Sequence, residues 1–130
     1  MMRSVMRIAP VFGIILALLS MPAVSAGYSE AKTPTQKQLL DLLSGNSIEG
    51  VWAGRPFDQF FAASGRTRYR EAGGSETLGR WSVNPKGQYC SVWPPSSSEV
   101  CYDVRVEGKT LYWKSGEKVY LSIVSEGASF

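Results

Sequence analysis

The chain has 130 residues, a net charge of +3 at neutral pH, two cysteines and no histidine. This length suits one small domain, which buries only a modest fraction of its surface. Without histidine the chain has no imidazole base for catalysis and no histidine metal ligand. The composition therefore excludes the histidine-dependent classes of enzyme.

Residues 1–26 have the three parts of a cleaved export signal. Arg3 and Arg7 precede an apolar run over residues 8–20, and Val24-Ser25-Ala26 supplies the small residues that signal peptidase requires. The run is shorter than the roughly 20 apolar residues that span a bilayer, which disfavours a membrane anchor. We predict cleavage after Ala26, a periplasmic or secreted location, and no transmembrane segment after cleavage.

The leader also changes the charge of the chain that follows it. It carries two of the fourteen basic residues, whereas all eleven acidic residues lie after it, so the chain from Gly27 onward has a net charge of +1. A nearly neutral domain without a lysine-rich tract gives no indication of a nucleic-acid partner. We expect a flexible spacer over residues 27–32 and a single, monomeric domain over residues 33–130.

Cys90 and Cys101 are an even pair in a chain predicted to be exported, so we predict a structural disulfide. Closing a loop of about a dozen residues stabilises a domain by roughly 3 kcal/mol in the chain-entropy model. The alternative is a redox pair, but the spacing is far from Cys-x-x-Cys. With the cysteines paired, no metal and no cofactor are expected.

One helix signal follows the spacer. Thr33 is placed to cap the helix, Pro34 to take its first position and Gln36 to complete a capping box, while Gly45 is placed to end it. The apolar face of this helix consists of Leu39, Leu40, Leu42 and Leu43.

The rest of the chain alternates short β-rich runs with turn residues, which is typical of an antiparallel sandwich or barrel. We predict eight strands, near Glu49–Ala53, Phe57–Ala62, Arg66–Arg70, Glu76–Val83, Gln88–Trp93, Glu99–Val106, Lys109–Lys114 and Lys118–Val124. Their short connections favour a meander, and closing the meander removes its exposed edges. The predicted fold is a mainly β, eight-stranded antiparallel up-and-down barrel with one short N-terminal helix.

The turns predict the register, and a slip of one residue would turn a strand's side chains to the other face. Asn84-Pro85-Lys86-Gly87 predicts a type I turn that places Val83 opposite Tyr89. The next hairpin places Cys90 opposite Cys101, as a cross-strand disulfide requires.

The last two hairpins continue this alignment. A turn at Glu107-Gly108 places Val104 opposite Leu111, and a three-residue loop then places Trp113 opposite Val119. One face of the sheet thereby collects Phe61, Tyr69, Trp81, Val83, Tyr89, Trp93, Tyr102, Val104, Leu111, Trp113, Val119, Leu121 and Ile123.

Large aromatic side chains dominate this predicted core. The barrel core is expected to hold Trp52, Tyr69, Trp81, Tyr89, Tyr102 and Trp113. Each ring buries roughly 150–250 Å², so we expect a filled interior in preference to a ligand cavity. Gly79 falls opposite Trp93, where it would leave room for the indole.

Two resemblances support this fold. Gly50-Val51-Trp52, which follows the helix and opens the first strand, resembles the Gly-x-Trp signature of lipocalins and the wider calycin group. That resemblance implies that Trp52 closes the base of the barrel. Four segments resemble a family of small exported bacterial proteins of unknown function: Gly45–Gly50, Phe60–Gly65, Gly79–Val83 and Cys90–Cys101. The second resemblance spans most of the mature domain and implies no site.

A basic ridge lies on the opposite face of the sheet. Arg66, Arg68 and Arg70 alternate along one strand, and Arg80 faces Arg66 from the next strand. Such a patch suits an anionic partner, such as lipid phosphate, an envelope polysaccharide or an acidic protein. The alternative is an ordinary solvated face, partly neutralised by Glu76 opposite Arg70.

Candidate catalytic carboxylates are Glu76, Glu99 and Asp103, the residue type that glycosidases use as acid and base. The predicted register turns them outward among arginines, so we predict no enzyme activity. The predicted function is a non-catalytic exported module of the cell envelope, bound to an envelope component or protein that the sequence does not identify.

Two alternatives stay open. Periplasmic metalloprotease inhibitors are similar in being short lipocalin-like barrels with one disulfide, and this resemblance implies that Gly27–Thr33 would block a protease cleft. The other alternative is a carrier of a small apolar ligand inside the barrel.

Overall fold

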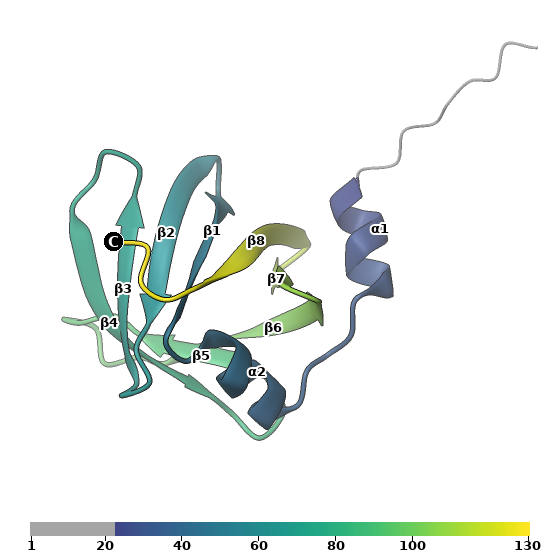
Figure 1. Ribbon diagram of the computed structural model, residues 1–130, viewed down its shortest axis with the longest axis horizontal. Coiled ribbons are helices and arrows are strands. Elements are labelled where there is room, and N and C mark those ends of the chain that lie inside the picture. The colour runs from purple at the N-terminus through teal and green to yellow at the C-terminus, as the bar shows by residue number, and fades with distance from the viewer. Residues whose placement is uncertain (1–22) are drawn as a thin grey trace, which may run out of the picture.

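The computed structural model describes residues 23–130, which form two helices and a closed barrel of eight antiparallel strands (Figure 1). The elements are α1 (Ala23–Glu30), α2 (Gln36–Leu43), β1 (Asn46–Trp52), β2 (Arg55–Phe61), β3 (Arg66–Glu71), β4 (Glu76–Val83), β5 (Tyr89–Val92), β6 (Val100–Glu107), β7 (Thr110–Ser115) and β8 (Lys118–Glu126). Consecutive strands pair and β8 returns to β1, so the predicted up-and-down barrel is confirmed. The predicted export signal lies outside the described residues except for its last four, which fall in α1.

The helix that the sequence predicts is α2, but its N-cap is Thr35 and not Thr33. Thr35 Oγ1 accepts a hydrogen bond from the Gln38 backbone N–H at 3.1 Å, and Gln38 Oε1 accepts one from the Thr35 N–H at 2.9 Å. Gln36, expected to complete the capping box, instead donates Nε2 to the Val83 carbonyl at 2.8 Å. This bond ties the start of α2 to the end of β4.

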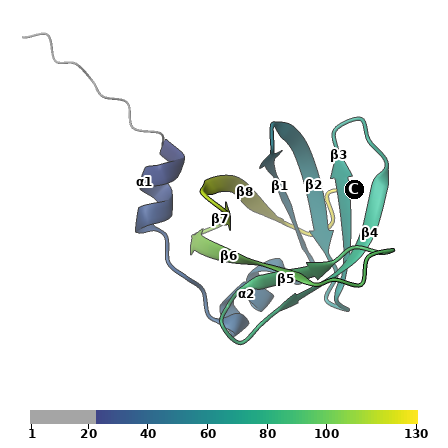
Figure 2. The same cartoon turned by 180° about the vertical axis from the view of Figure 1, so that it is seen from behind.

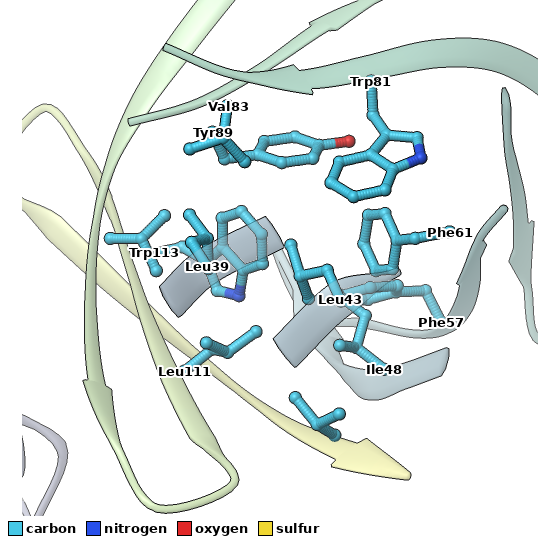
Figure 3. Packing of buried hydrophobic residues seen from close by; sticks show 12 residues of the cluster. Leu39, Leu43, Ile48, Phe57, Phe61, Trp81, Val83, Tyr89, Leu111 and Trp113 are labelled. Atoms are coloured by element: carbon cyan, nitrogen blue, oxygen red, sulfur yellow. The ribbon is translucent and has the colours of Figure 1, made fainter. Parts of the chain in front are cut away.

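α2 closes one end of the barrel, which we call the base (Figure 1). Its Leu39 and Leu43 are fully buried in the core cluster. Figure 3 shows these two leucines surrounded by Ile48, Phe57, Phe61, Trp81, Val83, Tyr89, Leu111 and Trp113. The base is therefore filled, as the sequence predicts.

Trp52 does not close the base, contrary to what the lipocalin resemblance implies. β1 starts at the base directly after α2, and its seven residues carry Trp52 to the opposite end, about 20 Å away. There Trp52 packs on Tyr120 and Tyr102, with ring centroids 4.3 and 5.8 Å away. Leucines of α2 occupy the place that the tryptophan was expected to take.

The register is confirmed across the middle of the barrel. The predicted pairs that the structure contains are Arg66 with Arg80, Arg70 with Glu76, Val83 with Tyr89 and Cys90 with Cys101. The two cysteines form the predicted disulfide, with Cα atoms 4.0 Å apart.

The predicted register of the β6–β7 hairpin is wrong by two residues. Val104 pairs with Trp113, and Leu111 pairs with Val106. The turn is the two-residue loop Gly108-Lys109, in which Gly108 has a φ of 60°. A positive φ at the first loop position is what the tightest hairpin turns require. A shift of two residues keeps each side chain on its predicted face.

The predicted register of the β7–β8 hairpin is wrong by one residue, so each side chain of β8 lies on the face opposite to the predicted one. Trp113 pairs with Tyr120, because the loop has two residues and not three. Ser122 and Val124 are consequently buried. The side chains predicted to be in the core, those of Val119, Leu121 and Ile123, alternate with these and lie on the outer face, where Ile123 is 48% exposed.

The N-terminal segment contacts the barrel. The Lys32 N–H donates to the Val106 carbonyl at 3.1 Å, and the Val106 N–H donates to the Lys32 carbonyl at 2.8 Å. The Arg105 guanidinium lies 4.1 Å from the Tyr28 ring centroid and donates to the Tyr28 carbonyl at 3.0 Å. Figure 2 shows α1 beside β6, β7 and β8. Within residues 23–130, neither helix has the length and apolar character needed to cross a membrane.

The cap of α2 gives a direct test of this fold. Thr35→Ala should lower the free energy of unfolding by about 1 kcal/mol, because it removes the acceptor for the Gln38 N–H. Thr33→Ala is the matched control and should have little effect. Urea unfolding followed by circular dichroism measures both, and a larger loss for Thr33→Ala would contradict this helix start.

Candidate functional site

The barrel interior holds a cavity of about 350 Å³, so the expectation of a filled interior in preference to a cavity is wrong. Its lining consists of Ile48, Trp52, Phe57, Gln59, Tyr69, Thr77, Tyr89, Ser91, Trp93, Tyr102 and Trp113. The volume lies within the range of about 300–1,000 Å³ that is usual for small-molecule sites. Trp52, Thr77 and Trp93 stand at strand ends away from α2, which makes this end of the barrel the mouth.

The rings fill the base but leave space nearer the mouth. At the base, Tyr89 meets Trp113 and Phe61 edge to face, with ring centroids 5.0 and 5.7 Å apart. Near the mouth, Phe57 stacks on Tyr69 of the adjacent strand at 5.3 Å, along the wall of the barrel. Rings that pack along the wall leave the space between opposite walls open.

Gln59 supplies a polar group to the cavity although it is only 7% exposed. The Thr67 hydroxyl donates to the Phe60 carbonyl at 2.8 Å, so its oxygen accepts from Gln59 Nε2, also at 2.8 Å. Nε2 donates further to the Tyr89 hydroxyl at 3.1 Å. These bonds fix which end of the amide is nitrogen.

The oxygen of the same amide is available to a ligand. Gln59 Oε1 accepts no hydrogen bond from any residue in the described part of the chain. In that part every fully buried side-chain nitrogen or oxygen has a partner, so this unpartnered oxygen is not fully buried. Oε1 is therefore reached from the cavity. It is a hydrogen-bond acceptor in a mostly apolar pocket, the arrangement that orients small ligands.

Trp93 forms one wall of the mouth. A Cβ atom at Gly79 would lie 2.5 Å from Trp93 Cε3, so only glycine leaves room for the indole, as the sequence predicts. Trp93 Nε1 donates to Ser91 Oγ at 3.1 Å, and its ring lies edge to face with Tyr69 at 6.0 Å. These contacts hold the indole in a defined position.

Two phenols of the cavity, those of Tyr69 and Tyr89, are neutral at neutral pH. Burial raises the pKa of Tyr89 above its usual value, against hydrogen bonds from Gln59 and Ser91 that lower it. Burial, followed by the charge of Glu71 and its hydrogen bond, raises the pKa of Tyr69 to about 12. Tyr69 donates its hydroxyl to Glu71 Oε1 at 3.2 Å, outside the cavity lining.

The six residues predicted for the barrel core divide into two groups. Trp81, Tyr89 and Trp113 are buried. Trp52, Tyr69 and Tyr102 are half-buried and line the cavity. These six side chains thus contribute both to the buried core and to the wall of the pocket, which Tyr89 and Trp113 also line.

The four arginines of the basic ridge do not form one uniform patch. Arg70 pairs with Asp58 at 3.2 Å and Arg68 pairs with Glu76 at 3.6 Å. Among the described residues, no side chain forms an ion pair or a hydrogen bond with the guanidinium of Arg66 or Arg80. The structure therefore separates a compensated half of the ridge from an uncompensated half.

The last residue of the chain occupies the compensated half. The Phe130 ring lies 4.2 Å from the Arg70 guanidinium and 5.1 Å from that of Arg68. Arg68 Nη2 also donates to the Phe130 carbonyl oxygen at 2.8 Å. Ser47, fully buried on the outer side of β1, holds the same tail by accepting from the Ser129 N–H at 2.9 Å.

The candidate acid and base groups lie away from the cavity. Asp103 accepts a hydrogen bond from Gln88 Nε2 at 2.8 Å on the outer face, and Glu76 is held by Arg68. Cys90, Glu99 and Cys101 form the one potential metal-ligand group of residues 23–130, but its two sulfurs are joined in the disulfide. None of these carboxylates lines the cavity.

Ile48, Phe57 and Gln59 were not predicted as lining residues, because no register was predicted for the first hairpin. The turn at Ala53-Gly54 pairs Trp52 with Arg55. The signal was present, since Phe61 was placed inward and the two-residue period of a strand then places Gln59 and Phe57 inward as well.

Comparison with models of protein families gives no match, and comparison with curated proteins gives no similar sequence. The resemblances to lipocalins and to small exported bacterial proteins therefore stay predictions.

The raised pKa of Tyr69 predicts that the free energy of unfolding decreases in alkali. Unfolded Tyr69 releases its proton near pH 10 and folded Tyr69 near pH 12, so the free energy of unfolding should fall as the pH rises through this window. The fall should be smaller in Tyr69→Phe when urea unfolding is measured at about pH 9 and about pH 11. Glu71→Gln removes the negative charge beside Tyr69 and should lower the pKa of Tyr69, so that its phenolate absorbance appears at a lower pH. An identical pH dependence of wild type and Tyr69→Phe would contradict this assignment.

Proposed function

We propose that this protein is an exported, non-catalytic binding protein that holds a small, uncharged, ring-containing ligand in the mouth of its barrel. One observation carries the proposal: a cavity of about 350 Å³ whose lining, within residues 23–130, is largely aromatic and contains no charged side chain. This favours the carrier among the functions that the sequence leaves open.

The chemistry of the lining supports an uncharged ligand. A charged group placed there would lose its hydration without gaining a counter-charge, at a cost of several kcal/mol or more. A planar ring can stack on the indoles and phenols of the wall, since such pairs contribute about 0.5–1.5 kcal/mol beyond the area they bury. A donor on the ligand can bind Gln59 Oε1.

Export is supported by the leader and by the disulfide. Cys90–Cys101 is consistent with an oxidising compartment, where such bonds persist. The leader predicts that compartment to be the periplasm or the outside of the cell. A partner in the cell envelope would then deliver or receive the ligand.

A non-catalytic role is supported by the character of the pocket. Its titratable groups are the phenols of Tyr69, Tyr89 and Tyr102, and its hydroxyls are those of Thr77 and Ser91. Burial keeps Tyr69 and Tyr89 protonated. The inhibitor alternative gains no such support, because part of the segment that would enter a protease is helical and bonded to β6.

Tryptophan emission gives the test. Trp52, Trp93 and Trp113 line the cavity, so the uncharged probe N-phenyl-1-naphthylamine should quench the tryptophan emission of the purified protein. The quenching should saturate as the probe concentration rises. Thr77→Trp, at the rim, should weaken probe binding at least tenfold by filling the mouth. Ile123→Ala is the control on the outer face, away from the cavity, and should leave probe binding unchanged. Absence of quenching, or equal binding by Thr77→Trp, would refute the proposal.

A further inference from the structure

Arg66 and Arg80 form a pair of like charges that the structure leaves uncompensated. They are directly opposite each other on β3 and β4, with both side chains exposed on the outer face. Residues in such positions have Cβ atoms about 4.5–5.5 Å apart, so two positive side chains destabilise the pair. Within residues 23–130 no acidic side chain forms an ion pair with either of them.

The pair borders a groove of about 400 Å³ on the outside of β2, β3 and β4. The groove also contains apolar surface from Phe60, Leu78 and Pro94. Leu78 is 62% exposed, more than any other large hydrophobic side chain described. The groove thus combines two free guanidinium groups with an apolar wall that water does not solvate well.

The neighbouring half of the ridge shows what this face binds. Arg68, which also lines the groove, donates to the Phe130 carbonyl oxygen and lies over the Phe130 ring. There the face holds an apolar group together with an oxygen acceptor. The half that contains Arg66 and Arg80 also places guanidinium groups beside apolar surface. There, however, no described acid pairs with either arginine, so both positive charges remain uncompensated.

We propose that this groove is a second binding site, for a single anionic amphiphile whose head is a phosphate. The head lies between Arg66 and Arg80, because guanidinium groups bind phosphate oxygens through paired, charge-assisted hydrogen bonds. The apolar chain lies along Leu78 and Phe60. The bound anion removes the repulsion between the two arginines.

This site is distinct from the barrel cavity. The β4 backbone at Gly79 separates them, with the groove outside and the Trp93 indole inside. The cavity has an uncharged lining and the groove has a cationic one, so the two sites select different ligands. The groove does not depend on the function proposed for the cavity.

Calorimetry with single-chain lipids below their micelle concentration tests the proposal. Lysophosphatidylglycerol should bind the purified protein at least tenfold more tightly than lysophosphatidylcholine of the same chain length and than inorganic phosphate. Added salt should weaken that binding. Equal affinity for the zwitterionic lipid, or for inorganic phosphate, would overturn the site. Binding to anionic vesicles without binding to the monomeric lipid would also overturn it, in favour of a membrane surface as the partner.

Paired variants locate the site. Arg66→Gln with Arg80→Gln should reduce lysophosphatidylglycerol binding at least tenfold, and Leu78→Ser should reduce it severalfold. Lys114→Gln with Lys118→Gln removes the same charge from exposed positions on β7 and β8 and should leave it unchanged. The arginine variant should unfold at the same or a higher urea concentration than wild type, and it should bind N-phenyl-1-naphthylamine normally. Retained lipid binding in a folded arginine variant would refute the proposal.

Discussion

The burial of Leu39 and Leu43 in the base of the barrel is the contact on which the rest of the structure depends. An open barrel of short strands would expose its aromatic layer to water at both ends. α2 covers one end, and each fully buried leucine contributes about 1.5–3 kcal/mol. The capping bond from Thr35 and the bond from Gln36 to Val83 position the helix for this contact. Residues 23–130 therefore form a cup, because among them a helix covers only one end.

The same strands present two chemically different surfaces. Inside, Gln59 Nε2 donates a hydrogen bond to the Thr67 hydroxyl, and none of the described residues that line the cup carries a charge. Outside, Arg66 and Arg80 are exposed to solvent, each next in sequence to a buried residue, Thr67 and Trp81 respectively. At Gly79 the backbone alone separates the Trp93 indole from the outer groove. Alternation along a strand therefore places a neutral site and a cationic site back to back.

Local patterns predicted much of this arrangement. The Asn84–Gly87 turn gave the correct pairing of β4 with β5, and that pairing carried Cys90 to Cys101. The prediction failed where a loop length was wrong. One residue fewer between β7 and β8 turned Leu121 outward and Val124 inward, because the side chains of a strand alternate with a period of two. An apolar strand with residues of similar character on both faces gives little sequence signal against such a slip.

The sequence by itself determined the class of fold, the disulfide, the basic ridge on β3 and β4 and the aromatic character of the interior. These follow from turn residues and from alternation, which act over a few positions of the chain. Only the tertiary structure decided that the rings leave a cavity and that α2 and not Trp52 closes the base. It also decided that Phe130 neighbours Arg68 and Arg70, while Arg66 and Arg80 have no acidic partner within residues 23–130. Those outcomes depend on how distant side chains share one volume or one surface, and no local pattern encodes the space left between them.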